Sequence, residues 1–408
     1  MKKCGLVGEK LGHSYSPYIH AQLADYEYRL YEKSPDELED FIRNGVWDGL
    51  NVTIPYKKAV LPWCDELSDT ARRIGSVNTL LRREDGSLFG DNTDAFGFRL
   101  LLRRLGVYPA GKKALVFGSG GASVMACAVL EELGVGSLTV VSRHGENNYE
   151  NLSRHYDAEL LVNATPVGMY PHNGEAVCSL APFTRCEAVA DVVYNPARTA
   201  LLLEAESLGL PCSNGLYMLV AQAKRSAEQF LGRPIPDGEI DRIESLLAFD
   251  TQNIVLVGMP GCGKSTVGRL LAERLGRELC EADSEIEREA SLTIPEIFAR
   301  FGEADFRRRE TETLRRLGAA SGTVISTGGG CVTQEGNYPL LHQNGVIVWL
   351  QRETAKLPRD GRPISLRSDL NELYARRAPL YARFADYTVS NDAAPEDTAE
   401  AILSLLRE

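Results

Sequence analysis

The segment GMPGCGKST (258–266) stands between the β-branched run NIVLV (253–257) and the helical pattern TVGRLLAERLG (266–276). It matches the phosphate-binding pattern G-x-x-x-x-G-K-[ST] at Gly258, Gly263, Lys264 and Ser265. Glycines allow successive backbone N–H groups to turn toward phosphate oxygens at the positive end of a helix. Because a strand and a helix flank the loop in register, the pattern predicts a P-loop domain with a parallel sheet, although glycine loops also arise by chance.

The chemistry of this loop indicates a nucleoside triphosphate. Lys264 adds a point charge for the β- and γ-phosphates, and Ser265 offers its hydroxyl to Mg²⁺. We therefore expect ATP and Mg²⁺ as the cofactors of this domain. The loop residues expected to bind the nucleotide are Gly261, Cys262, Gly263, Lys264, Ser265 and Thr266.

More than half of the chain precedes this loop. A chain of 408 residues is longer than one hydrophobic core usually organises, so two or three domains are expected. From Lys113 the sequence reads strand, glycine turn, helix and strand in KALVF, GSGGAS, VMACAVLEELG and LTVVS, which is typical of a doubly wound sheet. The turn is not a full G-x-G-x-x-G, so it is a weak signal by itself. The Pro- and Gly-punctuated segment 229–252 follows, and we place the domain boundary at residues 249–252.

Composition excludes several classes of function. The chain is 44% hydrophobic and 25% charged, and its formal net charge of −11 argues against general affinity for nucleic acid. Its 9 cysteines show no C-x-x-C spacing, which argues against zinc and a disulfide framework and fits a reducing cytoplasm. No run approaches the roughly 18 apolar residues of a membrane span. The first apolar run breaks at Gly8 and Glu9, which argues against a signal peptide. We expect a cytoplasmic monomer or homodimer with small-molecule substrates and no nucleic-acid or membrane partner.

Charged and glycine-rich motifs follow the P-loop. They are EADSEIE (281–287), GEADFRRRE (302–310), STGGGCV (326–332), DGRPIS (360–365) and ARRAPLY (375–381). An arginine fork binds a carboxylate in two places, so Arg307 and Arg377 suit an acidic small molecule, although a single arginine is more typically a solvated surface charge. Three glycines after a strand let the backbone approach a ligand closely.

With these motifs in this order, residues 253–405 resemble shikimate kinase throughout. The resemblance implies that Asp283 holds and orients the acceptor hydroxyl and that Arg362 reaches the phosphates from a lid. It also implies a set of shikimate-binding residues: Arg307, Gly328, Gly329, Gly330 and Arg377.

Two departures from the kinase pattern affect these assignments. Glu281 stands where the family usually has an aspartate associated with metal-bound water, so the expected metal-binding residues are Ser265 and Glu281. The lid segment RETAKLPRDGRP (352–363) is shorter than usual. The shorter lid leaves open whether Lys356 or Arg359 takes the adenine-side role.

The first half of the chain carries a different set of motifs. GEKLGHSYSPYIHAQL (8–23) puts Ser14 and Ser16 on a loop before a helix, where hydroxyls can bind an anion or cap the helix. NVTIPYK (51–57), GSVNTL (75–80) and GDNTDAFGF (90–98) follow. Carbonyl reduction requires a proton donor beside the oxygen while hydride arrives at the carbon. Lys57 and Asp94 can supply that pair if the fold brings them together, although a lysine at a strand edge is usually solvated.

Together with NATPVGM (163–169), DVVYNP (191–196) and NGLYMLVAQA (214–223), these motifs make residues 1–249 resemble shikimate dehydrogenase. The resemblance implies that Lys57 and Asp94 are the catalytic pair. It implies that the substrate is bound by Ser14, Ser16, Thr53, Asn78, Tyr194 and Gln222. The expected cofactor-binding residues are Gly118, Ser119, Gly120, Gly121, Ala122, Ser142, Arg143, Thr165 and Gly215.

The cofactor expected in this half is NADP(H). An NAD site places an acidic residue at the end of the second strand, where it binds the ribose 2′-hydroxyl. Here the strand ends at Ser142 and Arg143, and no acid occurs before Glu146. Arg143 can bind a 2′-phosphate instead. Only about twenty residues separate VVSR from NATP, so we expect one helix of this domain to be missing or reduced.

The fold class expected is α/β, with a dehydrogenase substrate domain and a Rossmann-like domain followed by a P-loop kinase domain. The dehydrogenase covers 1–249, with a substrate subdomain of 1–102 and 218–249 and an NADP-binding subdomain of 103–217. Residues 250–252 form the linker and 253–408 the kinase.

The resemblances imply two consecutive activities in one chain. The first half would reduce 3-dehydroshikimate to shikimate with NADPH, and the second would phosphorylate the 3-hydroxyl of shikimate with ATP. Two alternatives stay open. The first half could also oxidise quinate, or the chain could be a non-catalytic regulatory relative. Relatives of the regulatory kind lose catalytic groups, whereas Lys57, Asp94, Lys264 and Asp283 are all present here.

Overall fold

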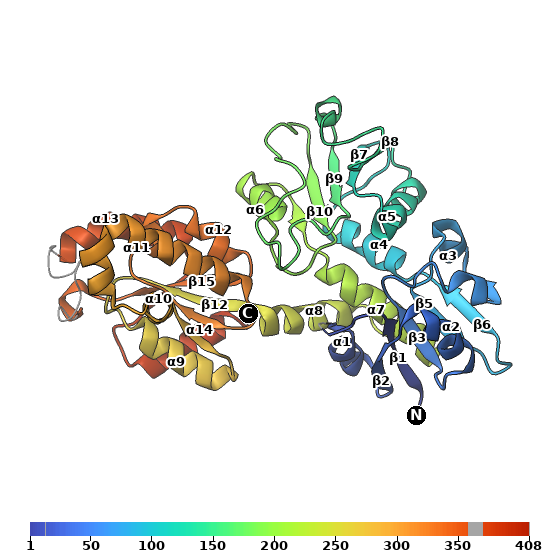
Figure 1. Ribbon diagram of the computed structural model, residues 1–408, viewed down its shortest axis with the longest axis horizontal. Coiled ribbons are helices and arrows are strands. Elements are labelled where there is room, and N and C mark those ends of the chain that lie inside the picture. The colour runs from blue at the N-terminus through green and yellow to red at the C-terminus, as the bar shows by residue number, and fades with distance from the viewer. Residues whose placement is uncertain (13, 358–369, 408) are drawn as a thin grey trace. The chain divides into compact units, whose positions relative to one another are not determined.

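The computed structural model of the protein describes residues 1–12, 14–357 and 370–407. Spatial contacts divide the chain into two compact units, whose elements are labelled in Figure 1. The first unit consists of Met1–Val167, Ala176–Tyr194 and Glu204–Leu246, and the second of Gly168–Glu175, Asn195–Leu203 and Leu247–Glu408. No helix within the described ranges is long and apolar enough to cross a membrane. Both units are α/β, which confirms the expected fold class.

The first unit begins with a six-stranded mixed sheet in the order β2-β1-β3-β5-β6-β4. Its strands are β1 (Lys3–Gly8), β2 (Glu27–Glu32), β3 (Gly49–Val52), β4 (Glu66–Leu67), β5 (Thr79–Arg82) and β6 (Leu88–Asp91). Strand β1 is parallel to β2 and β3, whereas β5 is antiparallel to β3 and β6. The parallel pair β1–β3 brings the segments that follow these two strands to the same edge of the sheet.

Short helices connect and cover this sheet. They are α1 (Ser16–Leu23), α2 (Pro35–Asn44) and α3 (Asp69–Ile74), with the 3₁₀ turn η1 (Leu61–Trp63). Helix α2 begins with a capping box formed by Ser34 and Glu37, and it buries Leu38 and Ile42 one turn apart. The buried residues therefore form a stripe along one face of α2.

Two longer helices complete this part of the unit. They are α4 (Asp94–Arg104) and α7 (Leu216–Leu231), which pack closely against each other. A Cβ atom on Gly97 of α4 would lie 2.5 Å from the carbonyl oxygen of Met218 in α7. A glycine is therefore required at this crossing, and its close packing fixes α7 beside the first residue of α4, Asp94.

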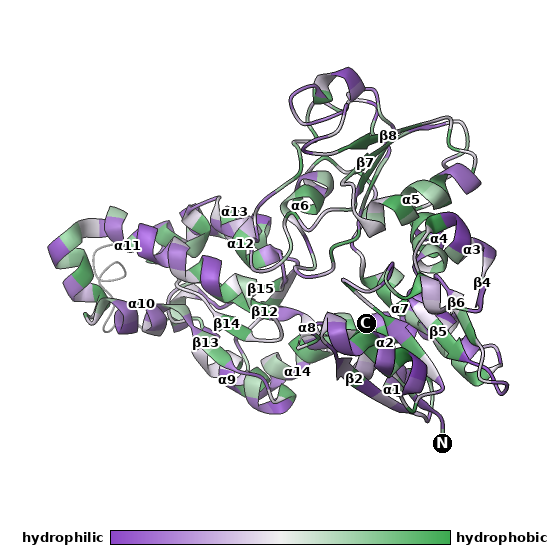
Figure 2. Cartoon of the chain, turned by 45° about the vertical axis from the view of Figure 1, so that its right-hand side comes forward, coloured by the Kyte–Doolittle hydropathy of each residue, from purple (hydrophilic) through white to green (hydrophobic). Residues whose placement is uncertain are grey.

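The second sheet of the first unit has five parallel strands in the order β11-β10-β9-β7-β8. The strands are β7 (Lys113–Phe117), β8 (Ser137–Val141), β9 (Leu160–Asn163), β10 (Ala188–Asp191) and β11 (Cys212–Ser213). Helix α5 (Gly121–Glu132) connects β7 to β8, and α6 (Ala200–Ser207) precedes β11. Figure 2 shows β7 and β8 mainly in the hydrophobic colour, as expected for strands of a parallel sheet.

The connection from β8 to β9 contains no α-helix. It contains a single 3₁₀ turn, η2 (Leu152–His155), where an α-helix would normally cross from one strand to the next. This finding confirms the expectation from the sequence that one helix of this domain is reduced.

The second unit is built on a five-stranded parallel sheet in the order β13-β14-β12-β15-β16. Its strands are β12 (Asn253–Val257), β13 (Leu279–Glu281), β14 (Val324–Ser326), β15 (Gly345–Gln351) and β16 (Tyr387–Ser390). The helices are α9 (Lys264–Leu275), α10 (Ala282–Ala290), α11 (Ile294–Ala319), α12 (Asn337–His342), α13 (Leu370–Phe384) and α14 (Pro395–Leu405). The turns are η3 (Cys331–Thr333) and η4 (Thr354–Lys356). The strand that leads into the P-loop, β12, is thus central in the sheet.

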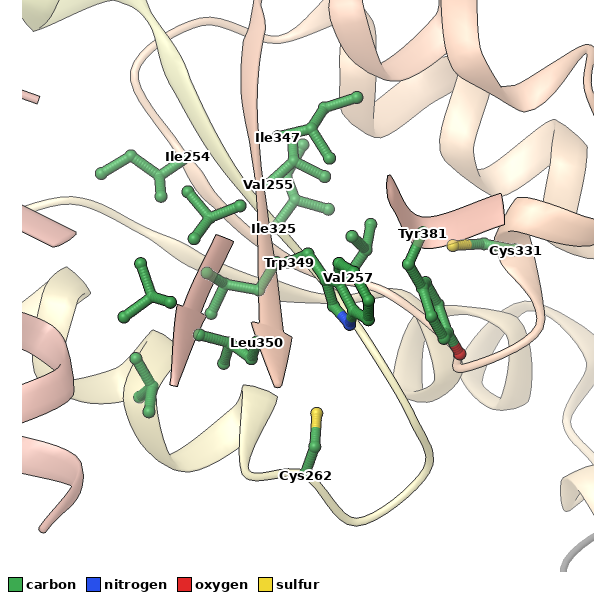
Figure 3. Close-up of a cluster of buried hydrophobic side chains, with 14 of the residues drawn as sticks. Ile254, Val255, Val257, Cys262, Ile325, Cys331, Ile347, Trp349, Leu350 and Tyr381 are labelled. Carbon is green, nitrogen blue, oxygen red and sulfur yellow. The ribbon is translucent and has the colours of Figure 1, made fainter. Parts of the chain in front are cut away.

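The second unit has a hydrophobic core of its own. Figure 3 shows part of it, with Ile254, Ile325 and Ile347 contributed by β12, β14 and β15. All the buried residues of this cluster lie between 254 and 403, whereas three clusters of the first unit lie between 4 and 235. Each fully buried aliphatic side chain contributes about 1.5–3 kcal/mol to stability, so each core stabilises its own sheets.

Helix α8 (Gly238–Thr251) leads almost directly into strand β12. Arg277 fixes the end of this helix, because its Nη2 donates to Phe249 O over 2.6 Å and its Nη1 donates to Gln252 O over 2.9 Å. Asp250 and Thr251 of the expected linker are helical. The domain boundaries themselves stay a prediction.

Candidate active sites

Lys57 and Asp94 come together in the first unit. Lys57 lies on the turns after β3, and Asp94 is the first residue of α4. Lys57 Nζ donates to Asp94 Oδ2 over 2.6 Å, although the two residues are 37 positions apart. The two side chains keep exposed fractions of 30% and 17%. The pair is therefore held by a charge-assisted hydrogen bond and remains accessible to a ligand.

A buried hydrogen-bond network connects this pair to two of the expected substrate residues. Asn78, which directly precedes β5, is buried, and its Oδ1 accepts from the backbone N–H of Thr93 over 2.7 Å. Asn78 Nδ2 donates to Gln222 Oε1 of α7 over 3.4 Å. Since Thr93 directly precedes Asp94, the network fixes the amides of Asn78 and Gln222 beside the start of α4.

The other expected substrate residues lie on the loops around the ends of β1 and β3. Thr53 follows β3, and its backbone N–H donates to Val7 O of β1 over 3.0 Å. Ser16 is the first residue of α1, and its N–H donates to Ser14 Oγ over 3.2 Å. The N-cap position of α1 is Tyr15, which makes no side-chain cap bond, so neither serine is the N-cap residue.

Tyr194 is packed against this loop. Its ring centroid lies 5.8 Å from that of Tyr15. Burial raises the pKa of Tyr194 above its ordinary value, so its hydroxyl stays protonated at neutral pH and can donate a hydrogen bond.

The glycine turn after β7 has the geometry of a phosphate-binding loop. Gly118 has a φ of +112°, and a Cβ on it would lie 2.8 Å from Ala164 O, so only glycine fits. Helix α5 begins at Gly121 with Gly120 as its N-cap residue, and a Cβ on either glycine would meet nothing within 4 Å. The positive end of α5 therefore faces open space at a turn whose Ser119, Gly120 and Gly121 are exposed.

The remaining residues expected at the cofactor site surround the strand ends. Ala122 is half-buried in the first turn of α5. Thr165 Oγ1 donates to Asn163 Oδ1 over 2.7 Å just after β9, and a Cβ on Gly215 would collide with Val192 O. Ser142 and Arg143 follow β8, and the Arg143 side chain is exposed.

The second unit contains a cavity of about 620 Å³ that unites the P-loop with the motifs downstream of it. Its lining includes Lys264, Ser265, Glu281, Asp283 and Arg307. Gly261 and Gly263 have φ values of +85° and +102°, which turn the loop around the start of α9. Lys264 Nζ donates to Gly258 O over 3.0 Å and to Met259 O over 3.1 Å. Thr266 also lines the cavity, whereas Cys262 is buried and is not one of the lining residues.

The glycines of the triplet 328–330 leave room for neighbouring groups that a Cβ atom would displace. A Cβ on Gly328 would lie 2.7 Å from Glu310 Oε1 and 2.8 Å from Asp283 Oδ1. A Cβ on Gly329 would lie 2.7 Å from Pro260 of the P-loop, and one on Gly330 would collide with the Arg307 guanidinium. The lack of side chains therefore allows the acceptor-side groups and the P-loop to converge.

Two arginines line the acceptor side of the cavity. Arg307 and Arg377 are both buried and line the cavity. Arg377 Nη1 donates to Gly329 O over 3.0 Å, and Arg307 Nη1 donates to Glu310 Oε2 over 2.7 Å. Arg307 Nη2 also pairs with Glu303 over 3.3 Å. Two guanidinium groups at one glycine turn are an arrangement that could bind a carboxylate, as the sequence predicts.

Glu310 also lines this cavity, and the sequence did not single it out. It is fully buried, and its Oε1 makes no hydrogen bond among the described residues. Burial raises the pKa of the Glu310 carboxyl, and the Arg307 guanidinium offsets part of this rise. The sequence feature that could have indicated Glu310 is its position three residues after Arg307, since residues at this spacing lie on the same face of a helix.

The lid expected from the sequence contains Lys356, Arg359 and Arg362. Arg362 and Arg359 lie outside the described residues. Lys356 Nζ is paired with Glu353 over 3.3 Å and with Asp392 over 3.4 Å on the protein surface.

From the resemblance to shikimate kinase, we expect the substitution Arg307→Ala to raise the KM for shikimate and to leave the KM for ATP nearly unchanged. An unpaired carboxylate costs about 2–3 kcal/mol, which corresponds to roughly 30- to 160-fold in kcat/KM. Steady-state kinetics with each substrate varied in turn measures the effect.

The matched control for this variant is Arg308→Ala, because Arg308 is the next residue, is exposed, and pairs only with Asp305 among the described residues. An unchanged KM for ATP reports that the kinase domain of Arg307→Ala has folded, because its hydrophobic core is separate from those of the first unit. An unchanged dependence on shikimate in Arg307→Ala would contradict the role of Arg307.

The fold and these sites define a chain that joins an oxidoreductase of the dinucleotide-binding type to a P-loop phosphotransferase. A family model for shikimate kinase matches residues 260–407, and one for the shikimate dehydrogenase substrate binding domain matches residues 6–80. A shikimate dehydrogenase (NADP(+)) of Clostridium perfringens is 36% identical over 254 residues, which cover 57% of this chain and 93% of the relative.

Solved structures agree with this relationship. A chorismate mutase/shikimate 5-dehydrogenase fusion protein from Clostridium acetobutylicum is 35% identical with a TM-score of 0.57, covering 60% of this chain and 97% of that one. A shikimate 5-dehydrogenase from Thermus thermophilus, solved with NADP(H) and shikimate, is 30% identical with a TM-score of 0.55, covering 60% and 98%. The chain belongs to the shikimate dehydrogenase family and carries a shikimate kinase domain at its C-terminal end. It is a bifunctional enzyme of the shikimate pathway, and both resemblances seen in the sequence are confirmed.

Proposed function

We propose that this enzyme reduces 3-dehydroshikimate to shikimate with NADPH and then phosphorylates the 3-hydroxyl of shikimate with ATP. The proposal is supported most by the 2.6 Å contact between Lys57 and Asp94 in the first unit. The cavity that joins the P-loop to Asp283 and Arg307 supports the second activity.

In the reduction, bound NADPH supplies hydride to the carbonyl carbon of the substrate. Lys57 Nζ donates a proton to the carbonyl oxygen, and Asp94 Oδ2 holds the ammonium group in place. Ser14, Ser16, Thr53, Asn78 and Gln222 bind the carboxylate and hydroxyl groups. The rigid amide network under Asn78 orients the ring before the proton moves.

In the phosphorylation, Asp283 accepts a hydrogen bond from the attacking hydroxyl while Arg307 and Arg377 bind the carboxylate. Lys264 stabilises the charge on the phosphates. Mg²⁺ would be held by Ser265 and Glu281, whose oxygens line the same cavity and suit a hard cation that keeps several water ligands. When bound, Mg²⁺ neutralises charge on the phosphate oxygens.

The partners we propose are these small molecules alone, for a cytoplasmic chain that is a monomer or a homodimer. The formal net charge of −11 disfavours a nucleic-acid partner. Light scattering of the purified chain measures its oligomeric state.

The function is tested by a coupled assay that starts from 3-dehydroshikimate with NADPH and ATP. We expect shikimate 3-phosphate as the product and shikimate as the intermediate when ATP is omitted. Oxidation of NADPH without any phosphorylated product would refute the kinase assignment, and no oxidation would refute the reductase assignment. Quinate as an alternative substrate distinguishes a quinate/shikimate dehydrogenase.

We expect Arg143→Ala to remove most of the preference for NADPH over NADH. Arg143 is exposed just after β8, where it can bond the 2′-phosphate that only NADPH carries. One such bond contributes about 1.5–3 kcal/mol, or roughly ten- to over a hundred-fold in kcat/KM for NADPH, with NADH unaffected.

The exposed Arg185, which pairs with Glu159, offers a matched control through Arg185→Ala. The measurement is kcat/KM for each cofactor in both variants. Equal use of NADPH and NADH by the unaltered protein would show that Arg143 points elsewhere.

A further inference from the structure

Arg352 is a cation beside the kinase cavity to which the proposed function gives no role. It follows directly on strand β15, and its side chain lines the same cavity as the P-loop and Asp283. The end of β15 is in contact with the P-loop, because a Cβ on Gly258 would lie 2.5 Å from Leu350 O. The central sheet therefore carries Arg352 to the edge of the phosphate-binding loop.

The guanidinium of Arg352 lies beside the end of the loop that faces α9. Its Nη1 is 4.0 Å from the position that a Cβ on Gly263 would take. Gly263 is the N-cap residue of α9. The region around it therefore carries the free N–H groups of the first helical turn and the positive end of the helix dipole, both of which attract anions. Arg307 and Arg377, by contrast, contact the glycine triplet. Arg352 thus lies on the nucleotide side of the cavity.

No acidic partner neutralises Arg352 within the described ranges. Its Nε is buried and has no hydrogen-bond partner there. Two nearby acidic residues pair with another cation: Glu353 and Asp392 both form ion pairs with Lys356. A partly buried guanidinium without a counter-ion is unfavourable, and a bound anion would satisfy it.

We propose that Arg352 is a nucleotide-binding residue whose guanidinium bonds the polyphosphate held by the P-loop. The inference rests on the proposed ATP site, in which Arg352 would be a second phosphate-binding cation besides Lys264. Lys264 contributes a single point charge from within the loop, whereas Arg352 brings a planar fork of donors from the end of a core strand. The guanidinium group can bind two phosphate oxygens at once. Arg352 therefore suits a polyphosphate ligand better than a ligand with a single charged oxygen.

Calorimetric titration of the full-length chain with ADP, inorganic tripolyphosphate and shikimate tests this proposal. We expect Arg352→Gln to weaken the binding of ADP and of tripolyphosphate about ten- to a hundred-fold, the range for a hydrogen bond between charged groups. Arg352→Lys should recover part of the loss, because it restores the charge but not the fork. Shikimate binding should be unchanged in both variants.

The matched control is Arg383→Gln, which removes an exposed arginine paired with Glu335 in the same unit. Equal ADP binding by the unaltered chain and Arg352→Gln would overturn the inference alone. Loss of ADP binding without loss of tripolyphosphate binding would also overturn it, since Arg352 would then contact the nucleoside. If the unaltered chain did not bind ADP, the proposed nucleotide site itself would be wrong.

Discussion

Lys57→Ala is expected to lower the rate of 3-dehydroshikimate reduction by roughly 10²–10⁴-fold, the contribution of a positioned general acid. The substitution removes the Nζ that donates to Asp94 and that we propose protonates the carbonyl oxygen. Phosphorylation of added shikimate should be nearly unchanged, because the hydrophobic core around the kinase sheet contains no residue of the dehydrogenase half. Oxidation of NADPH and formation of ADP, measured on one preparation, give both rates.

The neighbouring Lys58 provides a matched control. It is exposed, so Lys58→Ala removes the same charge one position further along the chain without touching the pair. Normal reduction by Lys57→Ala, or equal losses in the two variants, would contradict the assignment of Lys57.

Lys264→Ala is expected to have the largest effect on the second activity. The loss of one fixed cation that stabilises the charge of the transferring phosphoryl group lowers kcat by roughly 10²–10³-fold. Lys264 is buried and is held by the carbonyl oxygens of Gly258 and Met259, so its ammonium group is already positioned at the loop. The rate of phosphorylation at saturating shikimate and ATP measures the effect.

Reduction of 3-dehydroshikimate by the same Lys264→Ala preparation is the internal control, and it should proceed at the unaltered rate. Arg274→Ala is a matched control on α9, because Arg274 pairs with Glu400 near the far end of that helix. Unimpaired phosphorylation by Lys264→Ala would contradict the role of the loop.

The P-loop could be predicted from the sequence because its signal is local. Gly258, Gly263, Lys264 and Ser265 lie within a few positions of one another, between a strand and a helix that the pattern already indicated. The reduced connection between β8 and β9 was equally accessible, since it needs only a count of residues.

The contact between Lys57 and Asp94 depends on the fold, and the sequence could only suggest it through family motifs. The packing of α4 on α7 at Gly97 fixes the start of α4, and spacing alone does not contain that information. Glu310 and Arg352 were missed for a related reason. A charged residue on a helix or after a strand usually faces water, and only tertiary packing shows that Glu310 is buried and that Arg352 faces the cavity.

The direct passage from α8 into β12 has a consequence for the cell that makes this protein. With both enzymes on one polypeptide, every translation event yields one copy of each, so a change in expression scales the two steps by the same factor. The balance between them then depends on the catalytic constants of each site and on the concentrations of the substrates and cofactors, and no longer on the relative amounts of the two enzymes. Since each sheet has a core of its own, a mutation can adjust one constant and leave the other enzyme intact.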